Sequence, residues 1–247
     1  HSCHPWRLRI LGNDRLTIVS VTRPGDNLYE YKDGQPTWLA LGHLLETMCI
    51  AASGHGRDLA WTCTDTRRLP TGELRVEIDV RLPPKPAVAP DPLLGFIRVR
   101  SVDRTAYRLE ALSAPQKAAL AQALGPDLTV TWFEHWTERL RFARLGERAT
   151  DIRLRCPEAY EVHRQVIDWA HRFSPGGMPR TAIGLDAVTR TIMRWAMRDW
   201  DRVDRINRLM GTGAARLQLD LLPGLACAAH FTIGWRTPRH EAPSTDD

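Results

Sequence analysis

Leu74-Arg-Val-Glu-Ile-Asp-Val-Arg-Leu82 alternates strictly between apolar and charged side chains. Successive side chains of a β-strand point to opposite faces of a sheet, so this pattern predicts a strand with one buried face. Residues 59–63 predict a shorter strand just before it. Further upstream, apolar residues flank the turn signal Gly12-Asn-Asp14, which predicts a β-hairpin over 6–22.

A helix is predicted from Thr37, which we expect to cap it, to the glycines at Gly54 and Gly56. Its apolar residues recur at helical spacing: Trp38, Leu41, Leu44, Leu45, Met48, Cys49 and Ala52. Ser113-Ala-Pro-Gln116 predicts a capping box that opens a helix to about Leu124. The rest predicts strands at 128–133 and 227–235, and helices at 134–149, at 157–173 and, one or two, within 186–213. Together these elements predict an α+β fold.

Five prolines within 83–92 mark a stiff, extended segment, because proline is excluded from helix interiors and central strands. We therefore expect an N-terminal half at 1–82, a linker at 83–95 and a C-terminal half at 96–247. The two halves could be diverged copies of one α+β unit. The chain starts at His1 rather than Met, so we also expect it to be a fragment of a longer protein.

The composition narrows the class of protein. The formal net charge of the 247 residues is +5, and arginines and acids are interspersed along the predicted helices, which favours a solvated surface over a nucleic-acid patch. We find no apolar run long enough to span a bilayer and no signal-peptide pattern. The five cysteines are odd in number and lack C-x-x-C spacing, which fits a reducing cytoplasm better than a disulfide framework or a zinc site.

One candidate binding segment is Arg98-Val-Arg-Ser-Val-Asp-Arg-Thr-Ala-Tyr107. Guanidinium groups bind a phosphate through forked hydrogen bonds, and a serine hydroxyl adds a donor, so Arg100, Ser101 and Arg104 form a candidate phosphate site. The alternative is a surface stretch whose arginines pair with acids such as Asp103.

The second candidate is the opening segment, His1-Ser-Cys-His-Pro-Trp6. Ser2 and His4 can form hydrogen bonds to the edge of a heteroaromatic ring, while Trp6 anchors the loop in the core. The alternatives are a loop whose imidazole binds the backbone, or a metal site, which the absence of a distant partner pair disfavours. Both segments in one chain suggest a pocket for a phosphorylated aromatic cofactor.

Two further groups are weaker candidates. Trp132 and Trp136 could form a stacking platform for bases, although packing in the core is the commoner role. His43 and Glu46 could be catalytic, although a helix face turned to solvent explains them as well. We find no P-loop, G-x-S-x-G or G-x-G-x-x-G motif.

Three segments together resemble the FMN-dependent nitroreductase-like proteins. Ser2-Cys-His-Pro-Trp-Arg-Leu-Arg9 resembles their Asn-x-Gln-Pro-Trp-x-Phe signature, with Ser2 and His4 standing where the signature has Asn and Gln. The helix within 39–56 resembles the core helix of the family. Arg98-Val-Arg-Ser-Val-Asp-Arg104 resembles the Arg-Arg-Ser-x-Arg motif that cradles the FMN phosphate. The reversed order of the motifs is similar to that of the divergent Acg-like branch, which has two nitroreductase-like halves in one chain.

The resemblance implies a central, mostly antiparallel or mixed sheet flanked by helices, with a truncated C-terminal half. It implies FMN as the cofactor, with Ser2 and His4 at the ring edge and Arg100, Ser101 and Arg104 at the phosphate. It implies hydride transfer from NAD(P)H through flavin to a small acceptor, in a monomer that mimics a dimer or in a homodimer. Neither a catalytic side chain nor a metal is needed. The alternatives are an FMN-sequestering protein without turnover and an arginine-rich interaction domain.

Overall fold

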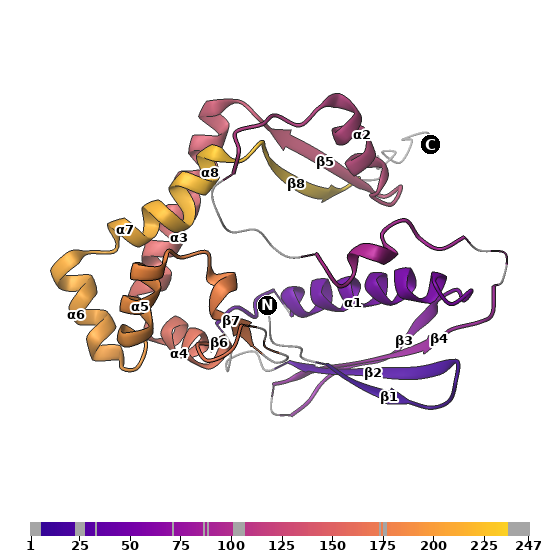
Figure 1. Cartoon of the computed structure of the whole chain (residues 1–247). Coiled ribbons are helices and arrows are strands. Elements are labelled where there is room, and N and C mark those ends of the chain that lie inside the picture. The colour runs from indigo at the N-terminus through magenta and orange to yellow at the C-terminus, as the bar shows by residue number, and fades with distance from the viewer. Residues whose placement is uncertain are drawn as a thin grey trace, which may run out of the picture. The chain divides into compact units, whose positions relative to one another are not determined.

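A computed structural model of the chain describes residues 6–22, 28–32, 34–70, 72–85, 87, 89–100, 107–172, 174 and 177–236 (Figure 1). The chain divides into two compact units. Unit 1 consists of His1–Asp103 and Pro157–Ile183, and unit 2 consists of Arg104–Cys156 and Gly184–Asp247.

A four-stranded antiparallel sheet forms the base of unit 1, with strand order β1-β2-β4-β3. Its strands are β1 (Trp6–Ile10), β2 (Arg15–Thr22), β3 (Ala60–Arg68) and β4 (Leu74–Arg81). The predicted hairpin is confirmed, because β1 and β2 pair antiparallel around the turn after Ile10. The alternating strand is β4, which lies between β2 and β3.

The core of unit 1 follows from that alternation. The apolar side chains of β4 share one face and pack with residues of β2 and of the helix α1 (Gln35–Ser53). The buried members are Ile18, Leu41, Leu45, Leu74, Val76, Ile78 and Val80. Figure 1 shows α1 lying against this sheet. The α+β prediction, an antiparallel sheet with helical cover, is thereby confirmed at the level of architecture.

The start of α1 differs from the sequence prediction. The N-cap is Gly34, which has a φ of 84°, and not Thr37. Thr37 lies inside the first turn, is buried, and donates a hydrogen bond from its hydroxyl to Glu30 Oε1 at 3.0 Å. A Cβ at position 34 would lie 2.8 Å from Leu74 Cδ2, so glycine is required there both for the backbone angle and for space.

The Pro-rich segment 83–95, expected as a linker, belongs to unit 1. Its first residues bind the loop after α1, since Asp58 N–H donates to Pro83 O at 3.0 Å and Lys85 N–H donates to Gly56 O at 2.7 Å. A short 3₁₀ helix, η1 (Leu94–Phe96), follows and packs on α1.

Unit 1 also contains a segment from later in the chain. It comprises α4 (Pro157–Val166), the two-residue strands β6 (Ile167–Asp168) and β7 (Met178–Pro179), and the 3₁₀ helix η2 (Arg180–Ile183). The helix predicted over 157–173 is therefore too long. It ends at Val166 because Ile167 and Asp168 pair in parallel with Met178 and Pro179.

Unit 2 is mostly helical and contains a two-stranded antiparallel sheet of β5 (Leu128–Phe133) and β8 (His230–Trp235). Its helices are α2 (Ala114–Gln122), α3 (Trp136–Arg155), α5 (Ala187–Ala196), α6 (Trp200–Met210), α7 (Gly213–Arg216), the π-helical turn η3 (Leu217–Leu221) and α8 (Leu222–Ala226). The predicted capping box of Ser113 and Gln116 is confirmed. The helix predicted over 134–149 continues to Arg155.

α3 is the central helix of unit 2 and packs against α7, η3 and α8. At the closest point, a Cβ on Gly224 would lie 2.8 Å from Ala143 Cβ. The guanidinium of Arg139 donates to the carbonyl oxygens of Leu225 at 3.1 Å and Cys227 at 2.8 Å, which fixes the end of α8 against α3.

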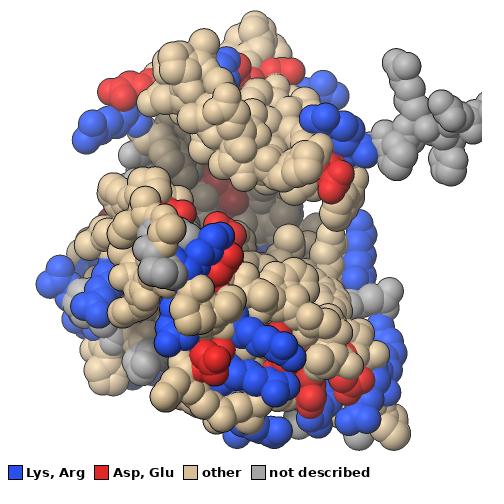
Figure 2. Space-filling model, turned by 90° about the vertical axis from the view of Figure 1, so that its right-hand side faces the viewer, with Lys and Arg blue, Asp and Glu red and all other residues tan. Residues whose placement is uncertain are grey.

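The surface charges are mixed. On the face shown in Figure 2, Lys and Arg side chains are interspersed with Asp and Glu side chains. Within the described ranges, no helix combines the length and the apolar character that crossing a bilayer requires. The described cysteines are Cys49, Cys63, Cys156 and Cys227, and Cys49, Cys63 and Cys227 are free thiols.

Candidate functional site

Of the five residues predicted to hold a cofactor, Arg100 is described. Ser2, His4, Ser101 and Arg104 lie outside the described residues. The side chain of Arg100 is exposed and makes no ion pair with a described residue, and its N–H donates to Phe96 O at 2.8 Å. Among the described residues, no acid neutralises the Arg100 guanidinium, which is compatible with a role in phosphate binding.

The segment that leads to Arg100 is fixed to the end of α1. Asp91 N–H donates to Ser53 Oγ at 2.8 Å, and Leu93 N–H donates to Asp91 Oδ1 at 2.7 Å. Leu94 then packs so closely on Gly54 that a Cβ there would lie 2.6 Å from Leu94 Cδ2. The arginine segment thus leaves from an anchored position in unit 1 (Figure 1).

Trp6, the last residue of the opening segment His1–Trp6, lies within the described residues. Trp6 begins β1, pairs with Ser20 across the hairpin and packs against the buried core of unit 1. The prediction that Trp6 packs against the core is confirmed, with the side chain half-buried. β1 and Arg100 both belong to unit 1.

The weaker candidates have ordinary surroundings. His43 and Glu46 are exposed on α1. Trp132 packs on Phe231 with ring centroids 5.6 Å apart, whereas Trp136 is 58% exposed. Among the described residues there is no group of His, Cys, Asp and Glu that could hold a metal, and His1, Cys3 and His4 lie outside them.

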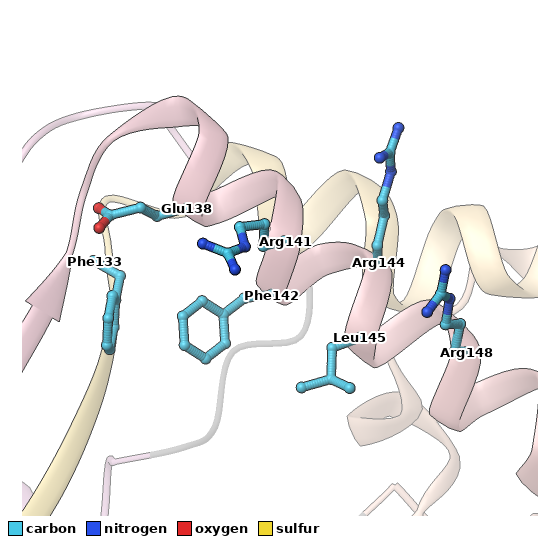
Figure 3. A pocket seen from close by; sticks show the side chains of 7 residues that line it. All are labelled: Phe133, Glu138, Arg141, Phe142, Arg144, Leu145 and Arg148. Carbon is cyan, nitrogen blue, oxygen red and sulfur yellow. The ribbon is translucent and has the colours of Figure 1, made fainter.

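A hollow of about 580 Å³ lies along α3 in unit 2 (Figure 3). Three apolar and four charged residues line it: Phe133, Phe142, Leu145, Glu138, Arg141, Arg144 and Arg148. All except Phe133, which ends β5, come from one face of α3. In Figure 3 the two phenylalanine rings lie beside each other. Their centroids are 4.8 Å apart.

These residues share a face because they are spaced three, four or seven apart along α3, which places side chains above one another on a helix. The same spacing is present in the sequence, where the arginines and acids interspersed along the predicted helices favour a solvated surface. The missing information was the position of Phe133, which comes from β5 and closes the hollow.

A second hollow, of about 490 Å³, shares Phe142 and Leu145 with the first and reaches His230 and Cys227. His230 stacks on Phe142 at 4.9 Å. Its Nε2 lies 2.9 Å from Gly224 O, an acceptor, so Nε2 carries the proton.

The same Nε2 lies 3.5 Å from Cys227 Sγ. A protonated Nε2 cannot take the thiol proton, and burial raises the pKa of Cys227. The pair therefore has a structural role and does not form a cysteine–histidine dyad.

Comparisons of the chain with protein families, with curated proteins and with solved structures gave no match.

Proposed function

We propose that the chain is an FMN-binding oxidoreductase of the nitroreductase-like type. The observation that supports the proposal is that the Pro5-Trp6 motif and residues Arg98–Asp103 of the arginine segment belong to the same compact unit, while Arg104 is the first residue of unit 2. The Pro5-Trp6 motif leads into the β1–β2 hairpin, and the segment from Arg98 follows η1, which is anchored on α1. The Pro-Trp motif, the helix α1 and the arginine segment follow one another in the order typical of the divergent Acg-like branch that the sequence resembles.

In this proposal Arg100, Ser101 and Arg104 bind the FMN phosphate, while Ser2 and His4 bind the edge of the ring. The described part of this set fits, because Arg100 has an exposed guanidinium without an ionic partner among the described residues. The flavin supplies the hydride chemistry, received from NAD(P)H and passed to a small acceptor. The chain supplies binding and orientation, in the cytoplasm, as a monomer of two nitroreductase-like halves or as a homodimer.

Flavin binding is tested with the full chain. Titration of FMN, followed by quenching of flavin fluorescence, should show saturable binding. Removing one hydrogen bond to a charged phosphate costs about 1.5–3 kcal/mol, so Arg100→Ala should weaken FMN binding by about tenfold or more. Arg81→Ala, which removes an exposed arginine of β4 in the same unit, is the matched control and should leave the affinity unchanged.

Equal FMN affinity of Arg100→Ala and the parent chain would contradict the assignment of the phosphate site. Bleaching of the bound flavin by NADH or NADPH would establish turnover. A bound flavin that neither donor reduces would instead indicate a protein that sequesters FMN. A colourless chain with salt-sensitive nucleic-acid binding would contradict both readings.

A further inference from the structure

The charges along α3 are unbalanced on the face of the hollow. Arg141, Arg144 and Arg148 are exposed and form no ion pair within the described part of the chain. Neighbouring like charges three or four residues apart destabilise a helix. An anion bound between these side chains would relieve that repulsion.

The acids of α3 do not provide this relief. Glu147 and Asp151 both form ion pairs with Arg216, and Asp151 also binds Arg155 at 3.0 Å. Glu138 accepts a hydrogen bond from His135 N–H at 3.1 Å in the capping box that opens α3. Every acid of α3 thus has another partner. The arginines of the hollow therefore have no acidic partner among the described residues.

Charged and apolar side chains alternate along the hollow, since Arg141 and Arg144 lie between Glu138 and Arg148 on α3. Glu138 lies in the first turn of α3, and Arg148 lies ten residues later, which corresponds to about 15 Å along a helix axis. Phe133, Phe142 and Leu145 supply the apolar surface. Aromatic rings of this kind favour stacking with planar ligands.

We propose that this hollow binds a purine mononucleotide. The base would pack on Phe133 with its amino group toward Glu138, and the phosphate would bind Arg144 and Arg148, while Phe142 is held by its contacts with Phe133 and His230. Arg141 would contribute to the positive potential between the two ends. The proposal concerns unit 2 alone and does not depend on flavin binding.

The test is isothermal titration calorimetry of the full chain with adenosine 5′-monophosphate, and with adenosine as the ligand that lacks only the phosphate. The double variant Arg144→Gln/Arg148→Gln removes the proposed phosphate contacts. The matched control, Arg155→Gln/Arg208→Gln, removes two exposed arginines of the same unit that are in ion pairs, so its net charge changes equally.

The proposal predicts that the parent chain binds the mononucleotide at least tenfold more tightly than adenosine. Arg144→Gln/Arg148→Gln should lose at least tenfold in affinity for the mononucleotide, while the control double variant and Arg100→Ala should change it less than twofold. Loss of FMN binding with intact mononucleotide binding would separate the two sites.

Three results would overturn the proposal. The first is that the parent chain does not bind the mononucleotide, and the second is that adenosine binds equally well. The third is that the two double variants lose affinity for the mononucleotide to the same extent. Circular dichroism of each variant verifies that the fold is retained.

Discussion

Asp168 shows how local donors set the charge of a single side chain. Its carboxylate accepts hydrogen bonds from the N–H groups of Ala170 at 3.0 Å and His171 at 3.1 Å, and it contacts His171 Nδ1 at 2.9 Å. The His171 ring is the largest cause, and together these donors lower the pKa of Asp168 from 3.8 to about 2. The folded chain therefore prefers the ionised carboxylate.

The sign of the pH effect follows from this depressed pKa. Asp168 stabilises the folded state at pH above its ordinary pKa, and the contribution disappears as the pH falls toward 2. We expect the stability difference between the parent chain and Asp168→Asn to shrink from pH 5 to pH 2. Urea unfolding at a series of pH values measures it, and a difference independent of pH would refute the assignment.

A single buried side chain also controls the stability of unit 1. Ile18 of β2 is 0% exposed between β4 and α1, whereas Ile10 of β1 is 78% exposed. Ile18→Ala should destabilise the fold by about 2–5 kcal/mol, because it removes buried methyl groups and leaves a cavity. Ile10→Ala is the matched control and should change the unfolding free energy by less than about 1 kcal/mol. Equal losses in urea titrations would show that the core is misplaced.

At the scale of elements, the contact of α8 with α3 depends on Gly224. A Cβ there would lie 2.8 Å from Ala143 Cβ and 3.0 Å from Ala143 Cα, which is closer than side chains tolerate. We expect Gly224→Ala to destabilise the fold by about 1–3 kcal/mol through overpacking. Thermal unfolding measures the change.

Gly213 of α7 provides the control for that substitution. A Cβ at Gly213 meets no atom within 4 Å, so Gly213→Ala should be neutral or slightly stabilising. If both variants unfold at the temperature of the parent chain, this result would contradict the close contact between α8 and α3.

The elements that were predicted correctly are those whose sequence pattern lies within a few neighbouring residues. The period of two in β4, the turn at Gly12–Asp14 and the capping box at Ser113 each depend on neighbouring residues. The start of α1 was wrong because Gly34 has the left-handed backbone that caps the helix, while Thr37 binds Glu30 instead. The pairing of β5 with β8 joins residues 128–133 to residues 230–235, and no local pattern reveals such a partner.

The candidate sites follow the same division. The arginines of the segment at 98–104 stand out in the sequence because they resemble a known motif. The hollow on α3 was missed because its charged run is typical of a solvated face, and only the fold brings Phe133 beside Phe142.

At the scale of the whole molecule, the chain returns to a unit that it has left. Residues 157–183 group with the first 103 residues, although α3 and β5 lie between them in sequence. The prolines within 83–92 indicate that the backbone is stiff there, but they do not indicate which distant segments pack together. The boundary of the units could therefore not be derived from composition.

We propose above all that the folded chain binds FMN through residues of the segments His1–Pro5 and Arg98–Arg104. This proposal is tested most directly by gel filtration of the full chain after incubation with FMN, with visible absorbance recorded across the elution. The account predicts that flavin absorbance elutes with the protein for the parent chain and is lost from that peak for Arg100→Ala/Arg104→Ala. Flavin that elutes only at the position of the free cofactor, from a folded parent chain, would contradict it.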